Sequence, residues 1–213
     1  MSDVYKNYQA LTSDKVEGIH YQVRYQNHQS LLCLSAPHGG GIEAGTTELV
    51  EAISMSQPSW SWYAFEGLQS SGNRDLHITS TNFDEPRQLR LLENVHWHIT
   101  FHGMRGTKAE TYIGGRDVEL KEAIRRKLTE KGFIVKDARK GVAGMEVRNI
   151  TNATIRGMGV QLELTAEQRK QFFQHNNWAK SNRRHPSNWT KSLHHYKNAL
   201  IEAIEEHMKR RPS

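Results

Sequence analysis

Apolar, β-rich runs alternate with helical patterns along most of this chain, and that alternation limits the folds it can adopt. The strand-like runs are residues 21–26, 30–36, 61–67, 76–81, 95–103, 110–115, 132–138 and 159–165. The helical patterns are residues 44–55, 84–94, 116–132, 165–175 and 192–211. Strands and helices that alternate through short joints predict an α/β fold, with a mixed, mostly parallel sheet flanked by helices.

No internal repeat, low-complexity tract or Pro/Ser-rich linker divides the sequence, so we expect residues 1–213 to form a single domain. We also expect a monomer. No apolar run approaches the length needed to cross a membrane. The first residues lack the basic and apolar segments of a secretory signal, and the single cysteine, Cys33, lies in an apolar run. These features predict cytoplasmic synthesis and a buried thiol, with cell lysis as the route to any activity outside the cell.

The chain has a formal net charge of +6 and a sequence pI of about 9.4. A basic surface of this size suits a polyanionic partner, which includes nucleic acid, anionic lipid and acidic polymers. Part of the excess lies in residues 180–191 and 208–212, which could equally be solvated surface and a frayed tail.

Residues 38–43 read HGGGIE and follow an apolar strand-like run. Consecutive glycines permit a turn tight enough to bring His38 and Glu43 toward one point. An imidazole and a carboxylate suit zinc, which takes a third protein ligand and leaves a position for water. His102 is the candidate third ligand because it ends the strand-like run at 95–103 and precedes a glycine, whereas His96 and His98 lie deeper in that run.

Glu163 interrupts the apolar side chains of residues 160–164 and projects from the polar side of a strand-like run. A carboxylate there is costly unless a partner or a cation compensates it. Near a metal it could act as a general base; alternatively, it faces solvent on an edge strand.

Five ordered segments resemble the poly-γ-glutamate hydrolase family of bacteriophages and bacilli, whose fold is similar to that of zinc carboxypeptidases. They are APHGGGIEAGTTEL, LHITSTNFDEP, FHGMRG, YIGGRD and GVQLEL. The resemblance extends from about residue 10 to residue 205. It implies a zinc-dependent enzyme that cuts the γ-glutamyl amide bonds of a capsule polymer, which phages remove to reach the cell.

By this resemblance, His38, Glu43 and His102 would be the zinc ligands and Glu163 the catalytic glutamate. Arginines suit the free α-carboxylates of the polymer because a guanidinium group binds a carboxylate through two parallel hydrogen bonds. Arg105 is expected to stabilise the developing oxyanion. The candidates for substrate binding are Arg156, Arg116, Arg74 and His77, with Arg148 as a further arginine near the motifs. Each arginine could instead be a solvent-facing charge, and His77 could support a metal ligand.

Two rival functions remain at this stage. Another zinc hydrolase, acting on N-acyl amino acids or on peptidoglycan, would use the same metal chemistry. A nucleic-acid-binding protein would share the basic pI, but the sequence has no helix-turn-helix, zinc-finger cysteines or aromatic RNA-binding motif, and its glycine run lacks the end of a phosphate-binding loop. We therefore favour an anionic polymer as the partner over nucleic acid.

Overall fold

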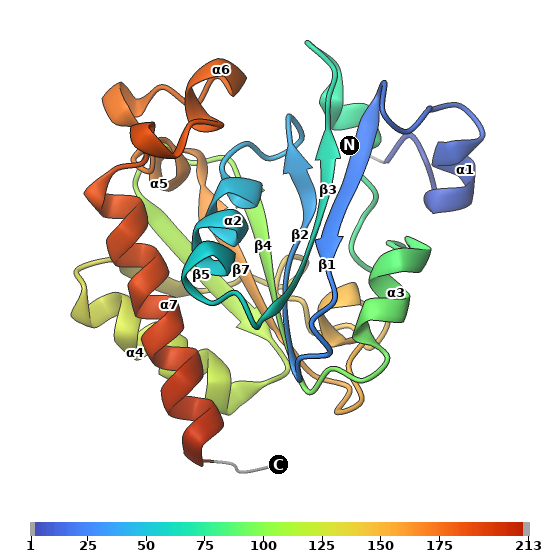
Figure 1. The fold of residues 1–213 in the computed structure, drawn as a ribbon. Helices are drawn as coiled ribbons and strands as arrows, with labels where there is room; N and C mark the ends of the chain where they lie inside the picture. Colours follow the sequence, from blue (N-terminus) through green and yellow to red (C-terminus); the bar gives the residue numbers. More distant parts are fainter. Residues whose placement is uncertain (1–2, 211–213) are drawn as a thin grey trace.

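A single seven-stranded sheet forms the centre of the computed structural model, which describes residues 3–210 (Figure 1). In spatial order it runs β1-β3-β2-β4-β7-β5-β6. The strands are β1 (Tyr21–Gln26), β2 (Leu32–Gly40), β3 (Ser61–Gly67), β4 (Trp97–Met104), β5 (Glu110–Gly115), β6 (Ile134–Asp137) and β7 (Val160–Thr165). Only the pairs β1/β3 and β5/β7 are antiparallel. The predicted α/β fold with a mixed, mostly parallel sheet is therefore confirmed.

Helices cover both faces of the sheet. On one face lie α2 (Thr46–Ser56), α4 (Val118–Glu130) and α7 (Lys191–Arg210), and on the other lie α1 (Tyr8–Thr12) and α3 (Pro86–Leu92) (Figure 1). The short helices are α5 (Ala166–Lys170), α6 (Lys180–Arg183) and the 3₁₀ turns η1 (Asn73–Leu76), η2 (Ile150–Asn152), η3 (Gln174–Asn176) and η4 (Pro186–Asn188). None of the helices in residues 3–210 combines the length and apolarity that a membrane span requires.

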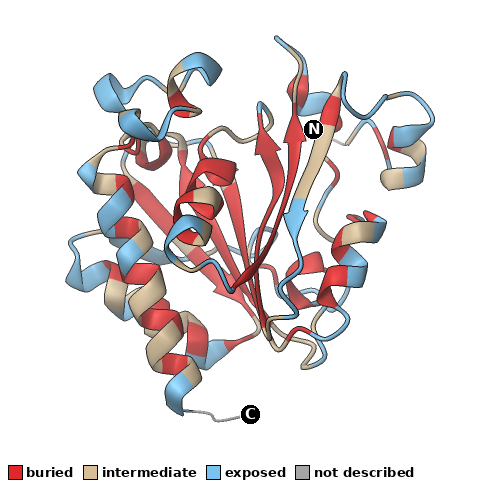
Figure 2. Ribbon diagram, in the orientation of Figure 1, coloured by how far each residue is buried: buried red, intermediate tan, exposed pale blue. Residues whose placement is uncertain are grey.

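The central strands are buried on both faces (Figure 2). In β2, Leu32 and Leu34 pack under α2 and α7, whereas Cys33 points to the core on the side of α1 and α3. A strand covered on both faces reads as a continuous apolar run, as the sequence of β2 does. Burial also raises the pKa of the Cys33 thiol to about 12, which confirms the prediction of a buried, unreactive cysteine.

The strand predicted at residues 76–81 does not form. Leu76 ends η1, residues 77–79 are irregular and a turn follows at 80–81. Two of the backbone groups bond to side chains instead of a neighbouring strand. The carbonyl oxygen of Ile78 accepts from His38 Nε2, and the Thr79 amide donates to the carboxylate of Asp3. Leu76 and Ile78 are nevertheless buried, which explains the strand-like sequence pattern.

Two helix boundaries also differ from expectation. The helix predicted at 84–94 begins only at Pro86, because Glu85 caps α3 by accepting from the Gln88 amide, while Asp84 accepts from the Tyr8 amide. The helix predicted at 165–175 ends at Lys170, because Phe172 and Phe173 turn into the core. The last residue of the final predicted helix, Arg211, and the rest of the basic tail lie outside the described residues.

The parallel strands β2, β4 and β7 run in one direction, so their carboxyl ends meet. We call this the site end of the sheet, where Gly40, Met104 and Thr165 end their strands. Because β5 is antiparallel to β7, its carboxyl end lies at the opposite end, beside the first residues of β4 and β7. We call that the far end.

Candidate active site

His38 lies in a β-bulge near the end of β2. Ala36 pairs with Ala64 and Gly39 with Glu66, so β2 has one residue more than β3 between these pairs. Such a surplus residue re-aims the side chains around it. The His38 ring is buried, and its Nε2 atom lies 2.8 Å from the carbonyl oxygen of Ile78. Since a carbonyl oxygen only accepts, Nε2 has the proton and the Nδ1 lone pair is free.

The three glycines after His38 lie where a Cβ atom would clash, with the Thr47 side chain at Gly39, with backbone at Gly40 and with the Asn73 side chain at Gly41. Gly39 and Gly40 continue β2, and only Gly41 lies beyond it. Gly40 has a φ of +63°, and a Cβ atom there would lie 2.6 Å from the carbonyl oxygen of Gly67. The turn then closes through a hydrogen bond of 2.9 Å from the Glu43 amide to the His38 carbonyl oxygen. This turn returns Glu43 to the side of His38, as the sequence predicted.

His38, Glu43 and His102 meet at one point. Glu43 Oε2 lies 3.6 Å from His38 Nδ1 and 3.9 Å from His102 Nδ1, and the two Nδ1 atoms are 3.1 Å apart. Ligands about 2.0–2.1 Å from a tetrahedral zinc ion are about 3.3 Å apart, so this triangle is of the right size to hold one. The Gly103 amide orients Glu43 through a hydrogen bond of 2.8 Å to Oε2.

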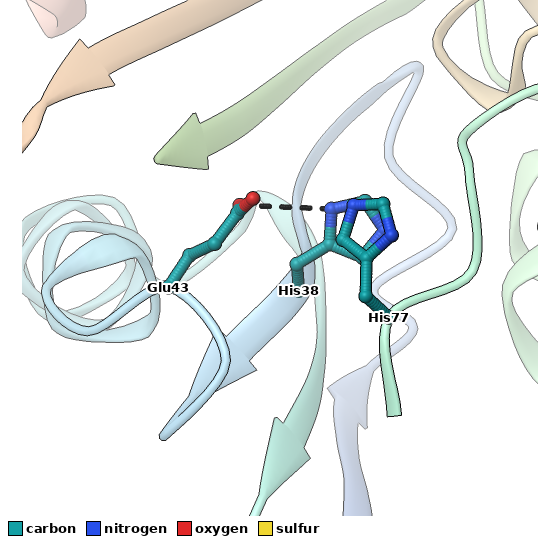
Figure 3. Close-up of side chains that lie close together, drawn as sticks. All are labelled: His38, Glu43 and His77. Carbon is teal, nitrogen blue, oxygen red and sulfur yellow. Dashed lines mark ion pairs between the residues drawn. The ribbon is translucent and has the colours of Figure 1, made fainter. Parts of the chain in front are cut away.

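His77 lies beside this triangle. It offers one ring nitrogen that lies within 4.8 Å of ligand atoms of His38 and Glu43, so these three side chains form a second candidate set (Figure 3). However, the His77 ring lies beside His38 with centroids 4.0 Å apart and ring planes tilted by 32°, and its Nδ1 bonds to Asp3 Oδ1 at 2.8 Å. That hydrogen bond occupies one of its two ring nitrogens, whereas His102 Nδ1 lies 3.1 Å from His38 Nδ1 and 3.9 Å from Glu43 Oε2. We therefore favour the set with His102.

The other two histidines of β4 are engaged elsewhere. His98 is buried with both nitrogens occupied, since Nδ1 donates to the Thr151 carbonyl oxygen and Nε2 accepts from the Ser35 hydroxyl. His96 precedes β4 at the far end of the sheet. Neither side chain can join the triangle, and His102 remains the ligand candidate on this strand.

Burial and neighbouring charge set the protonation of the triangle. Burial, reinforced by the positive charge that His38 has when it is protonated, lowers the pKa of His102 to about 3, so the His102 imidazole is neutral. Burial acts to raise the pKa of Glu43, but the adjacent histidines outweigh it and hold that pKa below its usual range. A neutral imidazole beside an ionised carboxylate is the state that metal ligands need.

Glu163 lies next to the triangle, directly across from His102 in the β4/β7 register. Gln161 Nε2 donates to Glu163 Oε1 at 2.9 Å and also to the Val142 carbonyl oxygen, so the carboxylate is held from one side. Burial, with the negative charge of Glu43, raises the pKa of Glu163. Because β7 lies between β4 and β5, the alternative of a solvent-facing glutamate on an edge strand is wrong.

A cleft of about 1330 Å³ opens above these side chains. Arg74 and Arg105 line it, are exposed, and form no ion pair among residues 3–210. Lys140 and Lys180 also line the cleft, are exposed, and form no ion pair among residues 3–210. The mouth of the cleft therefore has positive charge that the described part of the chain does not neutralise.

Two of the predicted substrate-binding arginines lie at the far end of the sheet and do not line the cleft. Arg156 Nη1 pairs with Asp117 at 2.7 Å, and its guanidinium group stacks on Trp97. Arg116 directly follows β5, whose direction places it at that end. The prediction failed because residues just before β7 lie at the opposite end of the strand from Glu163. Arg148 is exposed and also lies outside the cleft lining.

Both arginines of the basic segment 180–191 form ion pairs within the fold. Arg183 is buried and pairs with Glu48 in α2 at 2.8 Å, and Arg184 pairs with Glu66 in β3 at 3.0 Å. Of its arginines, neither is free to form an extended basic patch.

Sequence reasoning missed Arg169 and Asp3. Arg169 is a buried residue of α5 that lines the cleft. Its side chain donates hydrogen bonds only to backbone carbonyl oxygens, and no sequence motif predicts such bonds. Its one signal was its place six residues after Glu163. Asp3 binds His77 from a distant part of the chain, which no local pattern reveals.

Comparisons with known proteins agree with this geometry. A model of the family described as poly-gamma-glutamate hydrolase matches residues 5–199. The SPbeta prophage-derived protein YoqZ of Bacillus subtilis (strain 168) is 40% identical over 176 residues, which are 81% of this chain and 62% of YoqZ. YmaC of the same organism is 37% identical over 174 residues, 80% of this chain and 72% of YmaC. The chain thus spans less than two thirds of YoqZ.

Two solved structures superimpose over nearly the whole chain. A bacteriophage poly-gamma-glutamate hydrolase has a TM-score of 0.94 and 36% identity, with 99% of this chain and 100% of the other covered. A zinc-free apo form of YndL has a TM-score of 0.88 and 31% identity, with 97% of this chain and 99% of the other covered.

Proposed function

Since the chain belongs to the poly-gamma-glutamate hydrolase family, we propose that it is a zinc-dependent hydrolase that cleaves the γ-glutamyl amide bonds of poly-γ-glutamate. The observation that supports this most is the triangle of His38, Glu43 and His102 with the buried carboxyl group of Glu163 beside it. Two imidazoles and a carboxylate form the donor set of catalytic zinc sites.

The hydrogen bonds that orient His38 and Glu43 also suit a zinc site. The proton on His38 Nε2 is held by a backbone carbonyl oxygen, which leaves Nδ1 as the ligand atom and fixes the orientation of the ring. Glu43 is oriented by the Gly103 amide. Zinc held here would polarise the scissile carbonyl group and the attacking water.

Glu163 serves as the general base in this proposal. Its carboxylate accepts a proton from the water as the oxygen attacks the carbonyl carbon. When the C–N bond breaks, the same proton passes to the leaving amine nitrogen. Gln161 holds one carboxylate oxygen throughout, and the raised pKa of Glu163 suits a group that both accepts and returns a proton.

The cleft cations bind the substrate. Each residue of poly-γ-glutamate has a free α-carboxylate, and Arg74, Arg105, Lys140 and Lys180 offer unpaired positive charge along the cleft. Arg105 comes three residues after His102 and is assigned to the oxyanion formed at the carbonyl. The net charge of +6 speeds the encounter with a polyanion, an effect that salt weakens.

The biological setting belongs to the same proposal. We propose that the enzyme is made in the cytoplasm and acts outside the cell after lysis. There it would degrade capsule polymer, as a phage-type depolymerase does, and it would act as a monomer. The zinc carboxypeptidase-like fold remains a prediction from the sequence.

The decisive experiment compares purified poly-γ-glutamate, peptidoglycan and N-acyl-glutamate as substrates, with zinc content measured on the same sample. We expect only the polymer to be cut, with fragment size falling over time, and we expect a chelator to stop the reaction. A zinc-loaded protein that leaves the polymer intact but hydrolyses either alternative would assign the site to another zinc hydrolase.

A further inference from the structure

One buried guanidinium group bonds to three separate segments of the chain. Arg169 Nη1 donates to the carbonyl oxygen of Ala44 at 2.7 Å, Nη2 to that of Met104 at 3.2 Å, and Nε to that of Leu164 at 3.1 Å. These carbonyl groups belong to the turn after β2, the end of β4 and the end of β7. Arg169 therefore ties together the carboxyl ends of the three strands that meet at the site end.

Each of the three carbonyl groups lies next to a side chain of the proposed site. Ala44 directly follows Glu43, Leu164 directly follows Glu163, and Met104 lies two residues after His102. Gly103, which lies between His102 and Met104, donates its amide hydrogen to Glu43. A shift of any one of these backbones would move a ligand or the base relative to the others.

The surroundings of Arg169 favour a fixed guanidinium group. Trp178 covers it, with Cζ 5.2 Å from the ring centroid. On the other side, a Cβ atom at Gly103 would lie 2.5 Å from Arg169 Cζ, so only glycine leaves room for the guanidinium group there. Arginine suits this place because its planar fork directs donors outward in set directions, whereas the lysine ammonium is a compact point charge.

We propose that Arg169 is a positioning residue that sets the distances among Glu43, His102 and Glu163 through their backbones. This inference rests on the proposed function, because it concerns the same site. Arg169 also lines the cleft, but Nε and both Nη atoms already donate to carbonyl oxygens, so substrate binding is not its main role. It has no carboxylate partner within 4.0 Å among residues 3–210 that would explain its burial as an ion pair.

The test compares Arg169→Lys and Arg169→Met with Gly103→Ala. The first keeps the charge without the fork, and the second removes both. Gly103→Ala leaves Arg169 in place but pushes its guanidinium group aside. Arg87→Met is the matched control, since Arg87 also bridges several partners, Glu17, Glu85 and Tyr8, but belongs to α3 and does not line the cleft.

For all three variants we expect zinc affinity, measured by competition with a colorimetric chelator, to fall about 10- to 100-fold. We expect kcat on poly-γ-glutamate to fall by a similar factor while KM changes little. Arg169→Lys should be nearly as impaired as Arg169→Met, because geometry rather than charge is lost. Arg87→Met should lower the melting temperature without changing zinc affinity or kcat.

Two results would overturn the inference. Arg169→Lys with wild-type zinc affinity and kcat but a raised KM would make Arg169 a substrate-binding residue. A lower melting temperature with unchanged zinc affinity and kcat would make it a structural residue only. Should Arg169→Met fail to fold, Arg169→Lys and Gly103→Ala decide between these results. If the wild-type protein itself binds no zinc, the proposed function fails, which is a distinct outcome.

Discussion

The two ends of the sheet treat buried charge in opposite ways. At the far end, Arg156 pairs with Asp117 and stacks on Trp97, so each charge has a partner within the chain. At the site end, Glu163 is buried beside Glu43, and a raised pKa is the result. Arg169 supplies no direct ion pair there, because its donors go to carbonyl oxygens.

This difference shows where the fold leaves a ligand to complete it. Burying a carboxylate without a compensating charge is costly, and natural folds keep such an arrangement mainly where a metal or substrate supplies the compensation. At the far end, the charges of Arg156 and Asp117 compensate each other. In the proposed function, the site end takes up a cation at His38, Glu43 and His102 and an anion at Arg74 and Arg105.

The largest effect should come from His102→Ala. Removal of one ligand from the triangle should abolish stoichiometric zinc binding and all measurable turnover, which metal analysis and polymer digestion would show. His96→Ala, which changes the residue just before the same strand at the far end, should keep its zinc. Full zinc occupancy in His102→Ala would transfer the ligand role to His77, whose ring centroid lies 4.0 Å from that of His38.

Glu163→Gln should keep zinc but lose about 10²- to 10⁴-fold in kcat, because a neutral amide cannot accept the proton of the attacking water. The measurement is the rate of chain shortening at saturating polymer, with zinc content determined in parallel. Asp117→Asn changes a buried carboxylate at the far end in the same way and should not affect kcat. Full activity in Glu163→Gln would remove Glu163 from the mechanism.

Arg74→Met should raise KM for the polymer about tenfold and weaken its dependence on salt, since a cleft cation that pairs with no carboxylate among residues 3–210 is lost. Arg156→Met should instead leave KM unchanged and lower the melting temperature, because its partner Asp117 would remain buried and unpaired. Steady-state kinetics at two salt concentrations would distinguish them. An equal rise of KM in both variants would contradict the proposal that substrate binds at the site end of the sheet and not at the far end.

The smallest effect concerns His98, the second residue of β4, and it appears in stability. Burial lowers the pKa of His98 to about 4, whereas an unfolded histidine has a pKa of about 6.5. Between these values the unfolded chain binds the extra proton, so its contribution to stability is lost as pH falls from about 6.5 to about 4. Urea unfolding across this range should show a shallower decline in His98→Gln. An identical decline would mean that His98 is not held neutral.

The sequence predicted the site better than its surroundings. His38, Glu43, His102 and Glu163 come together because carboxyl ends of parallel strands converge, a rule that needs only strand direction. The same rule fails for Arg156, which precedes its strand. The unformed strand at 76–81 has buried apolar residues, but its backbone bonds to isolated groups of distant segments, namely His38, Asp3 and the Ile150 amide, and not to a neighbouring strand.

Arg169 lay beyond prediction for a different reason. Its partners are carbonyl oxygens, which every residue has, so no pattern of side chains indicates them. The pairing of Asp3 with His77 likewise depends on two segments distant in the chain. Such contacts form only in the assembled fold. The sequence contains both partners but does not show that they lie close together.

The bulge in β2 makes the length of this strand as important as its composition. If one residue between Ala36 and Gly39 were deleted, β2 could pair with β3 without interruption and the sheet could still assemble. The imidazole of His38 would then change faces or miss Glu43. A single-codon deletion at this point should therefore yield a folded, soluble and inert protein, a useful blank against which to measure hydrolysis by the intact chain.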